Sequence, residues 1–316
     1  MIELKSRSGI PDVIIIGGSH TGLSAALTLY RSLHTCLIFD SGTPRNRMAN
    51  HVHMVPGFND RNPNEFREVA RNELLATGLV QIVPRLVVSA ARLSDEFFEV
   101  IDSTGEHWKC RKILLAQGIK EKYPDIEGYA ELYGKYIFHC LFCFGFEQRG
   151  ADRGAVLAQG PLGTVEYATI FANDAKKFAK DIKIYTNGNA TLTAQLTEKS
   201  NPGVEIDDRK LKRVYKTSSD KLELIIQFDQ GPDDVVGFLA NQPEMPIDRT
   251  LVDQLGCEVV TTGIKVNPPF NSTTVPGVFA AGDCISQQKS ILNGLAAGSN
   301  AGVGIARELP VADADI

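Results

Sequence analysis

Short apolar, β-branched runs alternate along the chain with stretches whose apolar residues recur at helical spacing. Residues 12–16 (DVIII) and 35–40 (TCLIFD) are typical of buried parallel strands. Residues 23–33, which lie between them, predict an amphipathic helix. The three segments therefore predict a strand–helix–strand unit with a glycine-rich turn after its first strand.

A second unit of the same kind is predicted in the middle of the chain. Residues 155–158 and 182–185 read as strands, and residues 164–180 between them read as a helix. Two strand–turn–helix starts in one chain predict an α/β fold with two doubly wound nucleotide-binding-type domains. The remaining predicted elements are a strand over 221–229, a turn and strand over 275–283, and a helix rich in small residues over 290–307.

The chain length agrees with two domains, since 316 residues is about twice the usual domain size of roughly 150. We place the first domain at residues 1–120 and 240–316, and the second at 121–239. Apolar residues make up 43 % of the chain and charged residues 22 %, which is ordinary for a globular protein and excludes wholesale disorder.

Charge and the chain ends narrow the possible partners. With a net charge of −5, the chain lacks the excess of basic residues that is typical of nucleic-acid-binding proteins. No apolar run approaches the ~20 residues that span a bilayer. The first 13 residues contain no secretory signal, and the end ELPVADADI carries no lipidation box. We therefore expect a cytoplasmic protein that uses neither nucleic acid nor a membrane as a partner.

The turn after the first strand is a candidate dinucleotide site. Its residues are Gly17, Gly18, Ser19, His20, Thr21 and Gly22. They follow the pattern G-x-G-x-x-G, with Ser19 in place of the middle glycine, and Asp40 ends the next strand where an acid can bond ribose hydroxyls. The alternative is a sharp turn without a ligand. The spacing does not distinguish FAD from NAD.

A second motif near the end of the chain supports a flavin. Ala280, Ala281, Gly282 and Asp283 close a predicted strand, and the Asp283 carboxylate there could bond a polyol chain. The plainer interpretation of Asp283 is a helix N-cap. Taken with the N-terminal turn, the motif indicates one FAD domain built from both ends of the chain.

Cys140 and Cys143 form a C-x-x-C motif, the one close pair among six cysteines. A zinc site would need a further pair of ligands, and only His139 is adjacent, so we expect no metal. Two buried bystander thiols are a second possibility. A redox-active disulfide, in which one thiolate attacks and the other resolves, is the interpretation that we favour.

These motifs give the chain a family resemblance over nearly its whole length. DVIIIGG near the start, the C-x-x-C near residue 140 and GVFAAGD near residue 280 resemble the low-molecular-weight thioredoxin reductase-like flavoproteins. Within that group, the chain is most similar to the gliotoxin-type dithiol oxidases of fungal secondary metabolism. That likeness rests on residues 139–143 (HCLFC), on Asp40-Ser41-Gly42 with Arg45 and Asn46, and on His53 with Val55-Pro56-Gly57.

The resemblance implies an FAD site, a homodimer and a different role for each of the two cysteines. Cys143 would face the flavin, and Cys140 would meet the substrate thiol. Beyond the glycine turn, the implied FAD-site residues are Asp40, Ser41, Arg45, Asn46, His53, Ala116, Gly118, Gly282, Asp283, Ser290 and Ile291.

The second nucleotide-type domain lacks what an NADPH site needs. Ala158 stands in place of the first glycine of its turn, and Pro161 removes a backbone donor where phosphate should bind. Residues 186–190 (TNGNA) contain no arginine for a 2′-phosphate. We therefore consider NADPH unlikely and predict that a small dithiol metabolite reduces the cysteine pair, which passes electrons to FAD and then to molecular oxygen.

Phe144 departs from the pattern of the relatives, which carry an acid or a histidine after the second cysteine. Phenylalanine is neither acid nor base, so His139 is the nearest catalytic candidate by sequence, although it could equally be a packed histidine. One alternative function is an NAD(P)H- or ferredoxin-linked reductase of a thioredoxin-type disulfide. Others are a non-catalytic paralogue that binds a dithiol and a structural paralogue without flavin.

Overall fold

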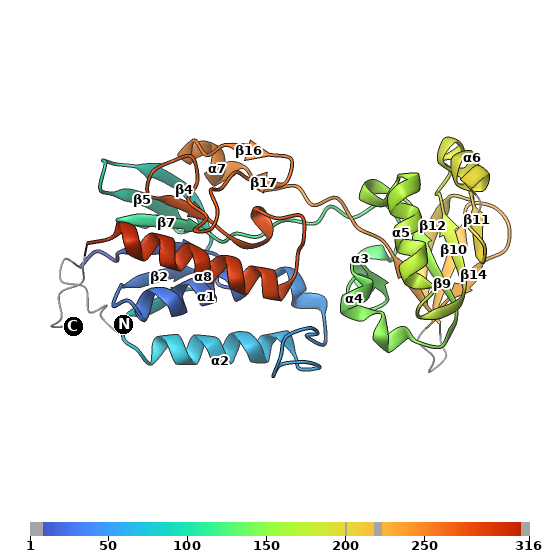
Figure 1. Cartoon of the computed structure of the whole chain (residues 1–316), viewed down its shortest axis with the longest axis horizontal. Helices are drawn as coiled ribbons and strands as arrows, with labels where there is room; N and C mark the ends of the chain where they lie inside the picture. Colours follow the sequence, from blue (N-terminus) through green and yellow to red (C-terminus); the bar gives the residue numbers. More distant parts are fainter. Residues whose placement is uncertain (1–8, 200, 218–222, 311–316) are drawn as a thin grey trace. The chain divides into compact units, whose positions relative to one another are not determined.

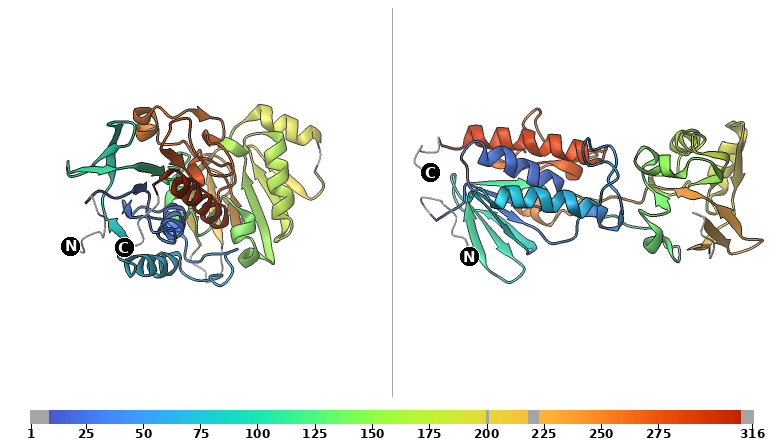
Figure 2. Two further views of the ribbon diagram at one scale, coloured as in Figure 1. Left: turned by 60° about the vertical axis from the view of Figure 1, so that its left-hand side comes forward. Right: turned by 90° about the horizontal axis from the view of Figure 1, so that it is seen from below.

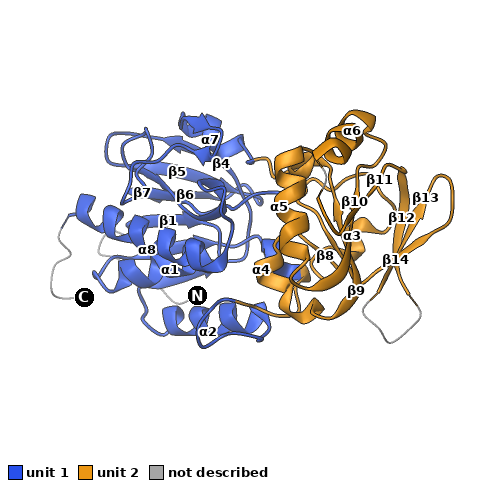
Figure 3. Ribbon diagram, turned by 45° about the vertical axis from the view of Figure 1, so that its right-hand side comes forward, with its two compact units in different colours: residues 1–47, 54–120, 247–316 blue, residues 48–53, 121–246 orange. Residues whose placement is uncertain are grey.

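The chain folds into two compact units, each built around a five-stranded parallel sheet (Figures 1 and 3). A computed structural model describes residues 9–199, 201–217 and 223–310. Unit 1 comprises residues up to 47, 54–120 and those from 247 onward, and unit 2 comprises 48–53 and 121–246. The terminal stretches behind the localisation prediction lie partly outside the described residues.

The sheet of unit 1 contains strands from both the early and the late parts of the chain. Its order is β18-β7-β1-β2-β3, and each neighbouring pair is parallel. Ile15 of the central strand pairs with Ile38 on one side and with Leu114 on the other. The strands are β1 (Val13–Ile16), β2 (Cys36–Phe39), β3 (Val80–Val83), β7 (Lys112–Leu115) and β18 (Val278–Ala280).

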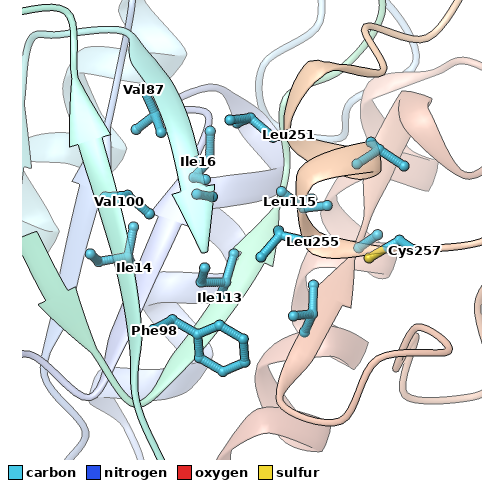
Figure 4. Packing of buried hydrophobic residues seen from close by; sticks show 14 of the residues in the cluster. Ile14, Ile16, Val87, Phe98, Val100, Ile113, Leu115, Leu251, Leu255 and Cys257 are labelled. Atoms are coloured by element: carbon cyan, nitrogen blue, oxygen red, sulfur yellow. The ribbon is translucent and has the colours of Figure 1, made fainter. Parts of the chain in front are cut away.

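Both faces of this sheet are buried, which explains why its strands read as continuous apolar runs. Val13 and Ile15 pack under the helices α1 (His20–Tyr30), α2 (Pro63–Leu75) and α8 (Ile291–Glu308). Figure 2 shows these helices in blue, light blue and red. Ile14 and Ile16 pack on the opposite face (Figure 4). The elements that cover that face include β4 (Val87–Arg92), β5 (Phe98–Asp102), β6 (His107–Cys110) and α7 (Thr250–Leu255).

Helices α1 and α8 approach closely because glycines line their contact. A Cβ atom on Gly298 would lie only 2.2 Å from the backbone oxygen of Thr21. One on Gly302 would lie 2.8 Å from Cβ of Thr28. The contact therefore needs the small residues that the sequence shows in this helix, and it fixes the start of α1 against α8.

The sheet of unit 2 has the order β11-β10-β9-β15-β8, and its pairs are also parallel. Helix α5 packs against one face of this sheet. A three-stranded antiparallel sheet, β12-β13-β14, packs against the other face. The parallel strands are β8 (Ile137–Phe138), β9 (Ala151–Leu157), β10 (Ala179–Tyr185), β11 (Val204–Asp207) and β15 (Phe238–Ala240). The other elements are α5 (Val165–Ala175), α6 (Ala190–Lys199), β12 (Leu211–Lys216), β13 (Leu224–Phe228) and β14 (Asp234–Val236).

Short elements complete the two units. They are η1 (Arg45–Met48), α3 (Tyr129–Leu132), α4 (Leu141–Phe144), η2 (Phe146–Gln148), η3 (Gly160–Leu162), β16 (Val259–Val260), β17 (Gly263–Ile264) and η4 (Gly282–Cys284).

A network of charged side chains surrounds the buried amine of Lys183 in unit 2. The Lys183 amine lies 2.6 Å from Asp234, 3.0 Å from Glu205 and 3.6 Å from Asp207. Asp234 also accepts hydrogen bonds from Arg153 and from the Tyr185 hydroxyl. Burial opposes the charge on Asp234, but Lys183 and Tyr185 hold the pKa of this carboxyl below its usual range. The charges are thus paired and hydrogen-bonded, as buried charges must be.

The α/β fold with two parallel nucleotide-binding-type sheets is confirmed, and several element limits are corrected. The predicted helix 164–180 ends at Ala175, because Ala179 already pairs with Ala151 as the start of β10. The helix predicted over 23–33 begins earlier, at His20, inside the glycine turn. The strand predicted over 221–229 is β13, and residues 221 and 222 lie outside the described part of the chain.

Two boundaries between the units differ from the domain limits placed by sequence. We placed the return to the first domain at residue 240, whereas the structure returns to unit 1 at residue 247. Residues 238–240 form β15, which pairs with β9 and β8 inside the sheet of unit 2. Residues 48–53 also group with unit 2.

Among the described helices, none combines the length and apolar character needed to cross a membrane.

Candidate functional site

The glycine turn of unit 1 packs too tightly for larger residues. Gly17 has φ +123°, and a Cβ atom there would lie 2.1 Å from the backbone oxygen of Ala116. A Cβ atom on Gly22 would lie 1.9 Å from the oxygen of Gly17. The Ser19 hydroxyl contacts Nδ1 of His20 at 3.1 Å and does not cap α1. The first N–H groups of this helix are therefore left for another acceptor, as at a phosphate-binding helix start.

Asp40 follows β2 and lies directly beside the turn. A Cβ atom on Gly18 would lie 2.4 Å from Cβ of Asp40, so only glycine allows this approach. The Asp40 carboxylate accepts a hydrogen bond from the N–H of Gly42 at 2.9 Å and another from Arg71 of α2. The Arg71 guanidinium also contacts the backbone oxygen of Gly18 at 3.4 Å. An acid at this place can accept bonds from ribose hydroxyls.

Positive and neutral nitrogen groups gather next to the turn. His20 is 8 % exposed, and burial together with the nearby Arg67 guanidinium lowers its pKa to about 4. Arg67 is 3 % exposed and donates to Oδ1 of Asn46 at 2.7 Å, while burial and Arg71 lower its pKa. His20 Nε2 and Arg71 Nε are buried and have no hydrogen-bond partner within the described parts of the chain. Orphaned donors and buried cations beside a helix N-terminus fit the pyrophosphate of a dinucleotide such as FAD.

The C-terminal motif meets the N-terminal turn in unit 1. Gly282 has φ +85°, and a Cβ atom there would lie 2.5 Å from the hydroxyl of Thr21. The Asp283 carboxylate pairs with Arg45 at 3.2 Å. Ser290 caps α8 by accepting from the N–H of Asn293, so Ile291 is the first residue of the helix. The C-terminal motif and the N-terminal glycine turn thus lie in contact within unit 1.

The other residues predicted for this site also lie in unit 1, with one exception. Ser41 follows Asp40, and its hydroxyl contacts that of Thr43 at 2.9 Å. Gly118, at φ +69°, lies just beyond β7 and Ala116. His53 groups with unit 2 instead. Arg67 and Arg71 were missed by sequence reasoning, although their spacing of four residues, which places both on one face of a helix, could have indicated a paired basic contact.

Cys140 and Cys143 form a disulfide in unit 2, with their Cα atoms 5.3 Å apart. Cys140 is the N-cap of α4, and its Sγ accepts a hydrogen bond from the N–H of Cys143 at 3.1 Å. Leu141 is buried and anchors the helix, whereas Phe142 and Phe146 are 71 % and 64 % exposed. The disulfide therefore lies on a fixed turn between exposed aromatic side chains. Within the described residues, no group of three or more His, Cys, Asp and Glu side chains could hold a metal ion.

Aromatic rings surround Phe144, the residue after Cys143. Its ring stacks on Phe138 at a centroid distance of 5.1 Å. Two histidines pack edge-on against it, His53 at 6.1 Å and His139 at 6.2 Å. His139 also stacks on Tyr133 at 5.9 Å. The structure thus brings His53 beside the cysteine motif, which its position in the sequence did not indicate.

The second nucleotide-type turn is crossed by a side-chain bridge. Asn187, which follows β10, donates from Nδ2 to Oε1 of Gln159 in the turn after β9, at 2.8 Å. Oδ1 of Asn187 accepts from the N–H of Leu211, also at 2.8 Å. The turn itself continues as the short helix η3, which contains Pro161. In a doubly wound domain, the ribose and pyrophosphate of a dinucleotide bind between these two loops.

Comparison with known proteins places the chain among thioredoxin reductase-like oxidoreductases. The family model described as pyridine nucleotide-disulphide oxidoreductase matches residues 11–301. The chain is 39 % identical to "Thioredoxin reductase tcpT" of Claviceps purpurea over 302 residues. This alignment covers 94 % of each of the two chains. It is 36 % identical to "Thioredoxin reductase aclD" of Aspergillus oryzae, over 94 % of this chain and 96 % of that one. An oxidoreductase structure from Agrobacterium tumefaciens aligns with a TM-score of 0.82 at 28 % identity, over 94 % of this chain and 98 % of that one.

Proposed function

Because this chain belongs to the pyridine nucleotide-disulphide oxidoreductase family, we propose that it is an FAD-dependent dithiol oxidase that closes a disulfide in a small metabolite with molecular oxygen. It is a thioredoxin reductase-like oxidoreductase, and the family implies FAD. Enzymes of this kind act on dithiol or disulfide substrates. The proposal concerns the direction of electron flow and the size of the substrate.

The bridge between Gln159 and Asn187 is the observation that carries this proposal. It links the two loops between which a doubly wound domain binds a dinucleotide, and residues 186–190 offer no arginine for a 2′-phosphate. A reductase of this family needs that site to receive electrons. The disulfide in the same unit still offers a route for electrons that enter as a substrate dithiol.

The chain's own residues support the exchange steps of this reaction. A substrate thiolate attacks Sγ of Cys140, which breaks the disulfide and releases the Cys143 thiolate. The second substrate thiolate then attacks the substrate sulfur bound to Cys140, which forms the product disulfide and releases the Cys140 thiolate. The hydrogen bond from the Cys143 N–H stabilises that leaving thiolate. FAD, when bound, supplies the two-electron acceptor that restores the disulfide.

The overall reaction balances as dithiol plus oxygen to disulfide plus hydrogen peroxide. Asp40, Arg67, Arg71, Asp283 and the turn at residues 17–22 would hold FAD. Phe142 and Phe146, which are exposed and lie close to Cys143 in the sequence, favour a small apolar substrate over a polar peptide.

An anaerobic titration of the purified holoenzyme tests the proposal. The flavin absorbance is followed during separate additions of NADPH and of dithiothreitol, and oxygen is then admitted while peroxide is assayed. We expect bleaching by the dithiol and not by NADPH, with recovery of the spectrum and peroxide on aeration. Rapid bleaching by NADPH would make the protein a reductase and overturn the proposal. Binding of dithiols without turnover would instead identify a non-catalytic paralogue.

A further inference from the structure

We propose that His53, paired with Glu147, moves the proton for thiol–disulfide exchange at Cys140 and Cys143. The inference rests on the proposed function, and it assigns His53 a role different from the FAD contact that the resemblance implied. His53 belongs to the short segment 48–53, which groups with unit 2 although residues 47 and 54 belong to unit 1. This excursion of the chain places a histidine beside the cysteine motif.

The geometry places His53 on the side of the motif that carries Cys143. Its Nε2 atom lies 3.7 Å from Oε1 of Glu147, and its side chain is 10 % exposed. Gly145, between α4 and η2, is also in the right-handed helical conformation. Cys143 and Glu147 are four residues apart along this nearly continuous helical stretch, so they share one face. Since His53 Nε2 lies near Glu147, the imidazole lies toward the face that presents the second sulfur.

The residue directly after Cys143 cannot take this role. Phe144 carries no titratable group, and its ring is the surface against which His53 packs edge-on. The other titratable groups around His53 are Glu147, His51, which stacks on it at 6.3 Å, and His139 across the Phe144 ring. A neutral imidazole near a thiol can take up its proton, and the imidazolium that forms favours the thiolate.

The proton balance of the exchange defines what His53 does. The attacking substrate thiol loses one proton, and the Cys143 thiolate released from the disulfide can take one up. His53 accepts the first proton and delivers one to the Cys143 sulfur, so it returns to its starting state. An imidazole ring can both accept and donate a proton through its ring nitrogens, which suits this double role.

Alkylation of the reduced holoenzyme tests this role without any substrate. The protein is reduced anaerobically, freed of reductant and treated with iodoacetamide between pH 5.5 and pH 9.5, and the modified peptide containing residues 140 and 143 is quantified by mass spectrometry. Cys36, Cys110 and Cys284 give little background, because burial raises the pKa of each thiol. Flavin absorbance confirms equal cofactor loading of all variants.

We expect H53Q to slow this alkylation about fivefold or more at pH 6.5 and to match the wild type at pH 9.5, where thiols ionise unaided. E147Q, which changes a side chain that is 41 % exposed and leaves His53 in place, should slow the reaction by a smaller factor. H51Q is the matched control on the same segment and should follow the wild-type curve. An H53Q curve that coincides with the wild-type curve at every pH would overturn the proposal, as would an equal loss in H51Q.

Oxygen consumption with dithiothreitol separates this inference from the proposed function. If the wild type produces no peroxide, the oxidase proposal fails, and the alkylation curves still decide whether His53 controls the thiols. If the wild type turns over and H53Q has the same pH–rate profile, the oxidase stands and the role of His53 is wrong. Should H53Q fail to fold, E147Q carries the test, because a pH–rate profile identical to that of the wild type contradicts the dyad.

Discussion

Replacing Gly298 with alanine is expected to destabilise unit 1 and to loosen its FAD site. The new Cβ atom would lie 2.2 Å from the backbone oxygen of Thr21 and 3.3 Å from the N atom of Ala25. Both neighbours belong to the backbone of α1, so no side chain can rotate out of the way. Helices α1 and α8 must therefore separate locally by about 1 Å to reach an ordinary contact distance.

Two opposing effects set the size of the change. Overpacking against backbone atoms, which cannot rotate away, costs about 2–3 kcal/mol, in the upper part of the usual range. Alanine in place of glycine inside a helix offsets this by about 1 kcal/mol. We expect a net loss of about 1–2 kcal/mol in the free energy of unfolding, or a fall of about 2–8 °C in melting temperature. FAD should be released at a lower temperature as well, because Thr21 belongs to the glycine turn.

Thermal and urea unfolding of the holoenzyme, followed by circular dichroism and flavin fluorescence, measures this change. Asn300→Ala is the matched control, since it improves the helix propensity of α8 at an exposed position away from α1. The control should be as stable as the wild type or slightly more stable. A Gly298→Ala protein with unchanged or increased stability would refute the close contact between α1 and α8.

Three further outcomes are expected. Because the folded-state pKa of His20 is about 4, its stabilising contribution is complete above about pH 6.5 and is lost as the pH falls toward 4. Urea unfolding should show a loss of about 2 kcal/mol between pH 7 and pH 5 that His20→Gln abolishes. Lys183→Met should cost about 3 kcal/mol in urea unfolding, because it leaves buried carboxylates without their amine, whereas the exposed Lys180→Met should change stability by less than about 0.5 kcal/mol. Cys140→Ser and Cys143→Ser should each retain FAD and lose peroxide formation from dithiothreitol, and full turnover in both would remove the disulfide from catalysis.

The strands and the glycine turn could be predicted because their signals are local. Val13 to Ile16 are buried on both faces of a parallel sheet, so every position is apolar, and Gly17 must adopt a positive φ next to Ala116. The end of α5 could not be predicted in this way. Ala179 and Lys180 suit a helix by propensity, but they pair in the sheet, and that choice depends on a strand about thirty residues away.

The candidate site shows the same limit more strongly. His53 lies in the sequence among residues assigned to FAD, yet it groups with the other unit and packs on Phe144. The bridge from Gln159 to Asn187 joins two loops that are 28 residues apart. Sequence spacing indicates what a motif can do, whereas contacts made across the fold decide which side chains serve it.

The sheet of unit 1 takes its edge strand β18 and its covering helix α8 from the last 40 described residues. During synthesis, the strands of unit 2 leave the ribosome before this sheet has its full set of strands. Domains of a nascent chain generally fold as units, so unit 2 can fold before β18 has been synthesised and has paired with β7. Flavin uptake should then come late in synthesis, and bound FAD would mark chains in which α8 has already left the ribosome.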